Sequence, residues 1–302
     1  MKVLSPTPEN IALAAQAIRE GRLVAMPTET VYGLAANAMD PDAVAHIFAA
    51  KGRPGNNPLI VHVASLEAAK DLVTAWPPEA DLLARKFWPG PLTLVLPKRS
   101  EVPSLTTAGL DTVAVRMPAH PVAKALIQAA GVPLAAPSAN RFTALSPTDL
   151  GHLAPEIIEQ VAFALDGGPC AVGIESTVVD LTAEPALLRP GGISRAQLED
   201  ALGKPLVQGD VRRSPGSHPR HYAPRARVEL VSEASLEAWA LVFAEPRSPR
   251  QIRMPKDAAG YAARLYRTLH DLDAAGADVV QIETPPGDWE AVWDRLRRAT
   301  SG

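Results

Sequence analysis

The feature that most constrains this chain is the alternation of short apolar runs with helical patterns over residues 1–207. Runs such as LIVHV and TLVLP are apolar almost throughout, which is typical of strands buried on both faces of a sheet. Strands are expected at residues 23–26, 59–63, 92–96, 112–116, 133–136, 163–165, 177–181 and 186–188. Helices are expected from Thr7-Pro8 to Gly21, from Asp40-Pro41 onward, and at 66–75, 78–87, 121–130, 155–160 and 195–202. This interleaving predicts an α/β domain whose sheet is covered by helices.

The pattern changes at residue 208. Residues 208–227 are rich in Arg, Pro, Gly and His and lose all apolar periodicity, so they are expected to form a linker. Beyond the linker we expect a strand at 228–233, helices at 235–243 and 257–275, a strand at 278–283 and a helix at 288–298. The sequence therefore predicts a large domain over 1–207, a linker over 208–227 and a small α/β domain over 228–302.

Composition limits the class of protein. The formal net charge is −3, which gives no global basic surface for nucleic acid and fits a small-molecule substrate better. The single cysteine, Cys170, can form neither an internal disulfide nor a zinc cluster, and it suggests a reducing cytoplasm. The N-terminus has no apolar signal region, and the longest apolar stretch, 238–244, is too short to span a bilayer. We expect a cytoplasmic protein without membrane contact.

Neither of the two common phosphate-binding loops is present. Residues 168–173 have the glycine spacing of a P-loop, but Ile174 and Glu175 stand where Lys and Ser/Thr are required. No GxGxxG fingerprint follows a strand. If the chain binds ATP, another arrangement must hold the phosphates.

Polar and cationic residues recur where the expected strands end. PTETVYGLAANA at 27–38 follows a strand, and open α/β folds bind ligands at such ends. Arg116 ends the apolar strand TVAVR, where a buried charge needs an anionic partner such as a ligand carboxylate or phosphate. Hydroxyl-rich loops follow at 136–148 and 173–181, and Arg189 lies in LRPGGIS. Together these residues predict a site for anionic substrates.

Each motif alone also has a structural explanation. Thr28 or Thr30 could cap a turn, and Lys51 and Arg53 follow a helix whose C-terminus favours cations. His62, inside an apolar strand, could be a core histidine with satisfied hydrogen bonds. The serines and asparagines of 136–148 could simply form turns.

Seven motifs in order carry a more specific signal. They are PTETVYGLAANA, KGRPGNNPLIVHV, WPGPLTLVL, VAVRMPAHP, APSANRFTALSPT, GIESTVVDLT and LRPGGIS. This series resembles the YrdC-like threonylcarbamoyl-AMP synthases over residues 10–200. The segment SPG…RHYAP at 214–224, with the C-terminal α/β unit, is similar to the long form of that family. The resemblance implies a twisted mixed sheet flanked by helices, followed by a small Rossmann-like domain.

The resemblance implies that L-threonine, bicarbonate and ATP give threonylcarbamoyl-AMP and pyrophosphate, the first step of threonylcarbamoyladenosine formation in transfer RNA. It implies that Lys51 and Arg53 assist catalysis. L-Threonine contacts are implied for Thr30, His62, Arg116, Ala136 and Ser176. ATP contacts are implied for Arg53, Asn57, Thr112, Ser138, Asn140, Ser146, Arg189 and Tyr222. No tightly bound organic cofactor is implied; Mg²⁺ is expected with ATP and no carboxylate cage for it is visible. A downstream threonylcarbamoyl-transferase machinery and weak tRNA contact are further expected partners.

The same resemblance implies that the linker folds over the site as a lid that excludes water from fragile intermediates. The family tends to have Met-Lys-Tyr after SPG, whereas this chain has Ser217-His218-Pro219. We therefore expect the lid of this chain to differ from that of its relatives.

Two other classes of protein deserve comparison. In a nucleic-acid-binding module the strand-end cations would grip phosphates, but the negative net charge and few aromatic residues argue against it. A carbamate-adenylating enzyme within a larger maturation factor would carry cysteine-rich zinc modules, which one cysteine excludes. Arg295, Arg297 and Arg298 on the last expected helix indicate a solvated helical face rather than a docking site.

Overall fold

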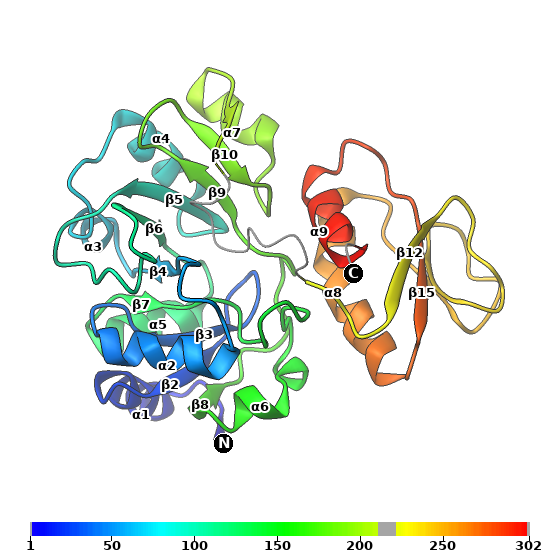
Figure 1. The fold of residues 1–302 in the computed structure, drawn as a ribbon, viewed down its shortest axis with the longest axis horizontal. Helices are drawn as coiled ribbons and strands as arrows, with labels where there is room; N and C mark the ends of the chain where they lie inside the picture. Colours follow the sequence, from blue (N-terminus) through cyan, green and yellow to red (C-terminus); the bar gives the residue numbers. More distant parts are fainter. Residues whose placement is uncertain (1, 211–221, 301–302) are drawn as a thin grey trace.

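The computed structural model describes residues 2–210 and 222–300, whose strands form two separate sheets (Figure 1). Most of the expected linker, including Ser217-His218-Pro219 and the SPG and RH of its motif, lies outside the described residues. We refer to residues 2–210 as the N-terminal unit and to residues 222–300 as the C-terminal unit. Within these two units no helix is long and apolar enough to cross a membrane.

The N-terminal unit is built on one mixed sheet. Its strands run in the order β1-β8-β2-β3-β7-β4-β6-β5-β9-β10-β11. Their bounds are β1 Lys2–Leu4, β2 Leu23–Met26, β3 Gly33–Asn37, β4 Ile60–His62, β5 Leu92–Pro97, β6 Thr112–Arg116, β7 Leu134–Ala135, β8 Val161–Leu165, β9 Thr177–Asp180, β10 Ala186–Arg189 and β11 Val207–Gln208. The sheet contains both parallel pairs such as β4–β6 and antiparallel pairs such as β5–β6. The expected mixed sheet is confirmed.

Helices cover both faces of this sheet. They are α1 Pro8–Arg19, α2 Pro41–Lys51, α3 Leu66–Lys70, α4 Pro78–Phe87, α5 Pro121–Ala130, the 3₁₀ turn η1 Leu150–His152, α6 Pro155–Ile158 and α7 Arg195–Leu202. The α1 and α5 helices pack on one face through a cluster that includes Ile18 and Leu126. The α2, α4 and α7 helices pack on the other face in a larger cluster that includes Ile47, Leu83 and Leu198.

Local sequence signals fix many helix ends. The Thr7 side chain accepts from the Asn10 amide and caps α1, and the Asp40 carboxylate caps α2 in the same way. The helices expected at 78–87, 121–130 and 195–202 have those bounds. The helix expected at 66–75 is shorter and ends at Lys70, because Val73 forms a bridge with Lys98 at the end of β5. Pairing with the sheet therefore ends α3 before the position that the helical pattern predicts.

The C-terminal unit is a four-stranded parallel sheet in the order β12-β15-β13-β14. Its elements are β12 Arg227–Val231, β13 Trp239–Val242, β14 Gln251–Arg253, α8 Ala258–Ala274, β15 Val279–Glu283 and α9 Glu290–Thr300. The helix expected at 235–243 is wrong. Residues 239–242 instead form β13, which pairs with strands on both sides, so strand pairing overrides the local helical pattern.

The two units are in direct contact. Figure 1 shows α8 and α9 between the C-terminal sheet and the N-terminal unit. One buried apolar cluster joins Val31, Leu145 and Ile174 of the N-terminal unit to residues of α8 and α9. Gly173 (φ +72°) approaches α8 so closely that a Cβ there would lie 2.5 Å from the carbonyl oxygen of Ala263. The C-terminal unit is therefore packed onto the loops of the larger sheet.

Candidate active site

A small cavity lies where several strands of the large sheet end. The residues that line it are Thr30, Val31, Arg53, Ile60, His62, Arg116, Ala136, Pro137, Ser138, Glu175, Ser176, Arg189 and Tyr222. We call it the three-arginine pocket, after Arg53, Arg116 and Arg189. The parallel strands β4 and β6 pair His62 with Arg116 at their carboxyl ends, the edge at which α/β sheets bind ligands.

The Arg116 guanidinium has an anionic partner within the chain. Its Nη2 lies 2.6 Å from Oε1 of Glu29, and its Nη1 donates to the Thr30 hydroxyl at 2.9 Å. Burial opposes the charge on Glu29, but Arg116 and nearby amides outweigh burial and lower the pKa of Glu29. The sequence predicted that Arg116 needs an anionic partner and proposed a carboxylate or phosphate of a ligand. In the structure a partner within the chain is Glu29. The sequence analysis did not identify Glu29 in this role, although it stands between the two threonines of the motif.

The turn that carries Glu29 is held by its own threonines. The Thr28 hydroxyl donates to the Val31 carbonyl at 2.6 Å and lies 2.8 Å from the Thr30 hydroxyl. The turn joins the antiparallel strands β2 and β3 directly, so neither threonine caps a helix. Thr28 therefore shapes the turn, while Thr30 points to Arg116 and the pocket.

His62 is fully enclosed and is not a core histidine with satisfied hydrogen bonds. Its Nδ1 is buried and has no hydrogen-bond partner among the described residues. Burial, and then the charge on Arg116, lower the pKa of His62 to about 3, so the ring is neutral near pH 7. The neutral His62 ring lines the cavity, and a ring that holds one nitrogen unpaired among the described residues is suited to hydrogen bonding with a ligand.

Arg53 has the surroundings expected of an anion-binding residue. Its guanidinium donates to Asn57 Oδ1 at 2.6 Å and to the Pro58 carbonyl at 3.0 Å. No carboxylate of the two described units lies within ion-pair distance of it. Burial, together with nearby Arg189, lowers the pKa of Arg53 to about 10, which still leaves it charged at neutral pH. A buried cation held only by neutral acceptors favours an anionic ligand.

Ser176 and Arg189 form a hydrogen-bonded pair in the wall of the pocket. The Arg189 guanidinium donates to the Ser176 carbonyl at 2.9 Å and to its hydroxyl at 3.1 Å. The same hydroxyl lies 2.7 Å from that of Thr93 on β5. This part of the wall is therefore pre-arranged by contacts between the segments that contain β5, β9 and β10.

Five residues expected at the site do not line the cavity. Lys51 Nζ donates to the carbonyls of Ser138 and Asn140 at 2.6 Å each, and Asn140 donates to the Ala144 carbonyl, so both hold the loop 136–148. Asn57 acts on Arg53, and the Ser146 hydroxyl donates to Glu175 Oε1 at 2.6 Å. Thr112 lies at the other end of β6, about 13 Å along the strand from Arg116 at about 3.3 Å per residue. Burial, and then Arg53, hold the pKa of Lys51 well below its usual range.

The last helix reaches the same region. Arg295 of α9, which the sequence suggested to be part of a solvated face, is 1 % exposed and is the largest fully buried side chain of the described residues. Its Nε lies 2.9 Å from Oε2 of Glu175, a residue of the three-arginine pocket. The expected solvated face is therefore wrong for Arg295, whose partner carboxylate stands 120 positions away in the sequence, whereas Arg297 is exposed as expected.

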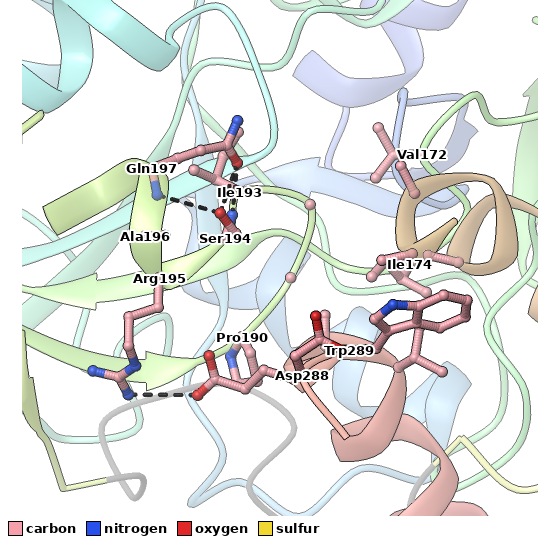
Figure 2. Close-up of a pocket in the computed structure, with 18 of the residues that line it drawn as sticks. Val172, Ile174, Pro190, Ile193, Ser194, Arg195, Ala196, Gln197, Asp288 and Trp289 are labelled. Atoms are coloured by element: carbon pink, nitrogen blue, oxygen red, sulfur yellow. Dashed lines mark hydrogen bonds and ion pairs between the residues drawn. The ribbon is translucent and has the colours of Figure 1, made fainter. Parts of the chain in front are cut away.

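A larger cavity of about 550 Å³ lies between the units (Figure 2). Figure 2 shows Val172 and Ile174 beside Trp289, with Arg195 at the opposite side. Its walls are mostly apolar, and Arg195 pairs with Glu290 at 3.4 Å. The three-arginine pocket has only about 50 Å³, room for a few water molecules. We place the candidate site in the three-arginine pocket nevertheless, because the three arginines and the neutral His62 ring converge on it.

The described residues offer no protein cage for a metal. Within residues 2–210 and 222–300 no group of three or more His, Cys, Asp and Glu side chains is arranged to hold an ion. Glu175, which lines the pocket, and Glu29, which lies behind Arg116, are each paired with an arginine. A metal used here would have to be held largely by a substrate and water.

Comparisons with known proteins agree with this architecture. The Sua5/YciO/YrdC family model, described as telomere recombination, matches residues 16–191, and a model described as the threonylcarbamoyl-AMP synthase C-terminal domain matches residues 193–301. Threonylcarbamoyl-AMP synthases from Pyrococcus abyssi and Bacillus subtilis are 44 % and 40 % identical, covering 96 % and 99 % of this chain and 94 % and 95 % of the relatives.

The three-dimensional likeness extends over both units. The crystal structure of P. abyssi Sua5 complexed with L-threonine superposes with a TM-score of 0.93 at 40 % identity, covering 99 % of this chain and 98 % of that one. The match includes the C-terminal unit as well as the large sheet. This chain therefore belongs to the Sua5/YciO/YrdC family and, within it, to the two-domain threonylcarbamoyl-AMP synthases.

Proposed function

We propose that this chain makes threonylcarbamoyl-AMP from L-threonine, bicarbonate and ATP in the three-arginine pocket. The observation that carries the proposal is the convergence of three buried arginines and the neutral ring of His62 on one cavity. Membership of the synthase family and the likeness to a relative complexed with L-threonine support it. Small substrates with a carboxylate and phosphates match such a cationic site.

L-Threonine is assigned to the β6 side of the pocket. Arg116 would pair with the substrate carboxylate through the fork of its guanidinium, beside the ion pair it already makes with Glu29. Thr30, which accepts from Arg116, would contact the same substrate. His62, Ala136 and Ser176 line the remaining walls and would enclose the amine and the side chain.

ATP is assigned to the side of the pocket that holds Arg53 and Arg189. Among the described residues Arg53 donates to neutral acceptors only, so phosphate oxygens would complete its surroundings. Ser138 and Tyr222 line the cavity beside these arginines. Asn57, Asn140 and Ser146 lie one contact further out, and with Thr112 they remain predicted ATP contacts. The cavity is smaller than ATP, so binding must move some of these side chains.

The reaction needs positioning and charge neutralisation more than a covalent intermediate. The threonine amine adds to bicarbonate, and the adduct loses one water molecule to give a carbamate. A carbamate oxygen then attacks the α-phosphorus, and the bond from that phosphorus to the leaving pyrophosphate breaks. Fixed arginines stabilise the charge that moves between these groups, because they need no reorganisation during the step. We propose this role for Arg53 and retain Lys51 as a further catalytic candidate.

We propose that magnesium enters as the complex with ATP, since the described residues supply no cage for it. We further propose that the protein works in the cytoplasm, that its product passes to a threonylcarbamoyl-transferase machinery, and that any tRNA contact is weak. The domain limits 1–207 and 228–302, with residues 208–227 as linker and lid, are part of the same proposal.

Release of pyrophosphate tests the reaction. The protein is incubated with ATP, magnesium, L-threonine and bicarbonate, and each component is omitted in turn, with carbon dioxide removed from the buffer for the bicarbonate omission. We expect release that requires all components. Release that ignores threonine or bicarbonate, or no release in the complete mixture, would contradict the proposal.

A further inference from the structure

Glu175 lies where the two units meet the three-arginine pocket. It precedes Ser176 at the start of β9 and is 7 % exposed. Its carboxylate accepts from the Ser146 hydroxyl at 2.6 Å, from the Tyr266 hydroxyl at 3.2 Å and from Arg295 Nε at 2.9 Å. Two of these three donors, Tyr266 and Arg295, belong to the C-terminal unit. Most of the hydrogen bonds that the Glu175 carboxylate accepts therefore come from the C-terminal unit and not from the sheet that carries Glu175.

Arg295 also holds a second segment of the pocket. Its Nη1 donates to the Pro190 carbonyl at 2.8 Å, and its own charge is balanced by Asp294 as well as by Glu175. The guanidinium lies 5.3 Å from the centre of the Tyr222 ring, which lines the pocket. One side chain of α9 therefore bridges the residue before Ser176 and the residue after Arg189.

The two bridged segments pack against each other without side chains between them. A Cβ on Gly191 would lie 2.4 Å from the Glu175 carbonyl oxygen and from the Thr177 nitrogen. Arg189 in turn donates to the Ser176 carbonyl and hydroxyl. A shift of either segment would move both pocket residues, because their backbones are in contact.

We propose that Arg295 is a positioning residue for the active site, which sets the geometry of Ser176 and Arg189 through Glu175 and Pro190. This inference rests on the proposed function of the pocket. The C-terminal unit would then take part in forming the active site. Of its described residues, Tyr222 at the linker end is the one that lines the cavity. Without Arg295 a buried carboxylate would lose its charged partner next to the substrate site, which favours rearrangement of that segment.

Arg295→Met and Arg295→Lys are the variants to compare. Methionine keeps the apolar stem and removes the charge, whereas lysine keeps the charge but cannot bridge two acceptors with a planar fork. The matched control is Arg247→Met, which removes an exposed arginine of the C-terminal unit that pairs with Glu233. For each variant the Tm, the dissociation constants of ATP and L-threonine by calorimetry, and kcat and KM for pyrophosphate release are measured.

We expect Arg295→Met to lower kcat/KM about 10- to 100-fold, mainly through kcat and ATP affinity, and the lysine variant to recover part of the loss. In Glu175→Gln/Arg295→Met the second change should add much less than its effect alone, because both act on one contact. Arg247→Met should behave as the wild type.

Two results would overturn the proposal. One is a folded Arg295→Met protein with unchanged kcat and ATP affinity; the other is full additivity of the two substitutions. Should Arg295→Met fail to fold, the lysine and Glu175→Gln variants carry the same test. ATP binding is measured without turnover, so a wild type that released no pyrophosphate would refute the proposed function and still leave the positioning role measurable.

Discussion

Two buried arginine–glutamate pairs each place one member in the wall of the three-arginine pocket, and they differ in where the second member comes from. Arg116 and Glu29, 2.6 Å apart, both belong to the N-terminal unit. Glu175 belongs to that unit too, but its partner Arg295, 2.9 Å away, is supplied by α9. One side of the pocket is therefore complete within the large sheet, and the other is completed by a separate unit packed on it.

This difference suggests a division of labour. The Arg116 side, assigned to L-threonine, should keep its geometry whenever the large sheet is folded. The side with Arg189, assigned to ATP, should depend on how well the C-terminal unit is docked, and of the threonine contacts only Ser176, which accepts from Arg189, should depend on it too. Perturbing the docking should therefore affect the two substrates unequally, and the predictions below test that inequality.

The largest effect is expected for Arg116→Ala. The substitution removes the guanidinium assigned to the threonine carboxylate and leaves Glu29 buried without its partner. We expect a loss of about 2–5 kcal/mol in L-threonine binding, with ATP binding nearly unchanged. Separate calorimetric titrations measure both. Arg22→Ala, at an exposed arginine paired with Glu20, is the control, and equal losses for both substrates would break the proposed division.

Arg53→Met should show the opposite selectivity. The variant removes a buried cation whose described partners are all neutral acceptors. We expect ATP to bind about 1.5–3 kcal/mol more weakly, the range for hydrogen bonds to a charged group, while L-threonine binds as before. The two calorimetric titrations again decide. Unchanged ATP affinity would remove Arg53 from the nucleotide side.

Docking of the units can be changed without touching a charge. A Cβ on Gly173 would lie 2.5 Å from the Ala263 carbonyl oxygen of α8, whereas one on Gly168 would meet nothing within 4 Å. Both glycines have φ near +70°, so Gly173→Ala and Gly168→Ala share the backbone strain. We expect Gly173→Ala to cost about 1–3 kcal/mol more in the free energy of unfolding, measured in denaturant, and to weaken ATP binding more than threonine binding. Equal behaviour of the two variants would contradict this.

The smallest expected effect is on the stability of the protein at acidic pH. His152 of the N-terminal unit and His270 of α8 stack with ring centres 4.1 Å apart. Burial, and then His270, lower the pKa of His152 to about 4, and burial lowers that of His270. Asp149 and Arg267 face His152, and Asp271 and Asp273 face His270. The pair therefore holds the units together best while both rings are neutral.

Because the folded pKa values lie below the usual value of about 6.5, the stabilisation is complete above that pH. This stabilisation is lost as the pH falls from 6.5 towards 4, and solvent screening keeps the loss small because His152 is only about half buried. We expect His270→Asn to flatten the fall in Tm between pH 6.5 and 5, and His46→Asn to leave it unchanged. A pH dependence equal to that of the wild type would show that the stack does not contribute.

The sequence was sufficient for most of the large sheet, although not for the short strands β1 and β11, because strands such as β2 and β5 are apolar almost throughout and the first helices begin at Thr7-Pro8 and Asp40-Pro41 signals. It failed at β13, where a four-residue strand sits inside a helix-like pattern and pairing with β14 and β15 decides. The strand β3 was missed for a related reason, since GLAAN lacks the β-branched residues that mark a strand.

At the site, the individual residues were predictable but their partners were not. The need for an anion beside Arg116 follows from its apolar strand, yet nothing local indicates that Glu29, on another strand end, supplies one. Arg295 was detectable in part. With Val292 and Leu296 it occupies the helical spacing of the buried face of α9, and an arginine on such a face needs a buried partner.

Direct detection of the product tests the central claim, that the pocket joins all three substrates. The protein is incubated briefly with ATP, magnesium, L-threonine and ¹³C-labelled bicarbonate, quenched, and examined by chromatography and mass spectrometry. The account predicts an adenylate that carries both threonine and the ¹³C atom, formed in equal amount to pyrophosphate and absent with Arg116→Ala. Pyrophosphate released without a labelled adenylate would contradict it.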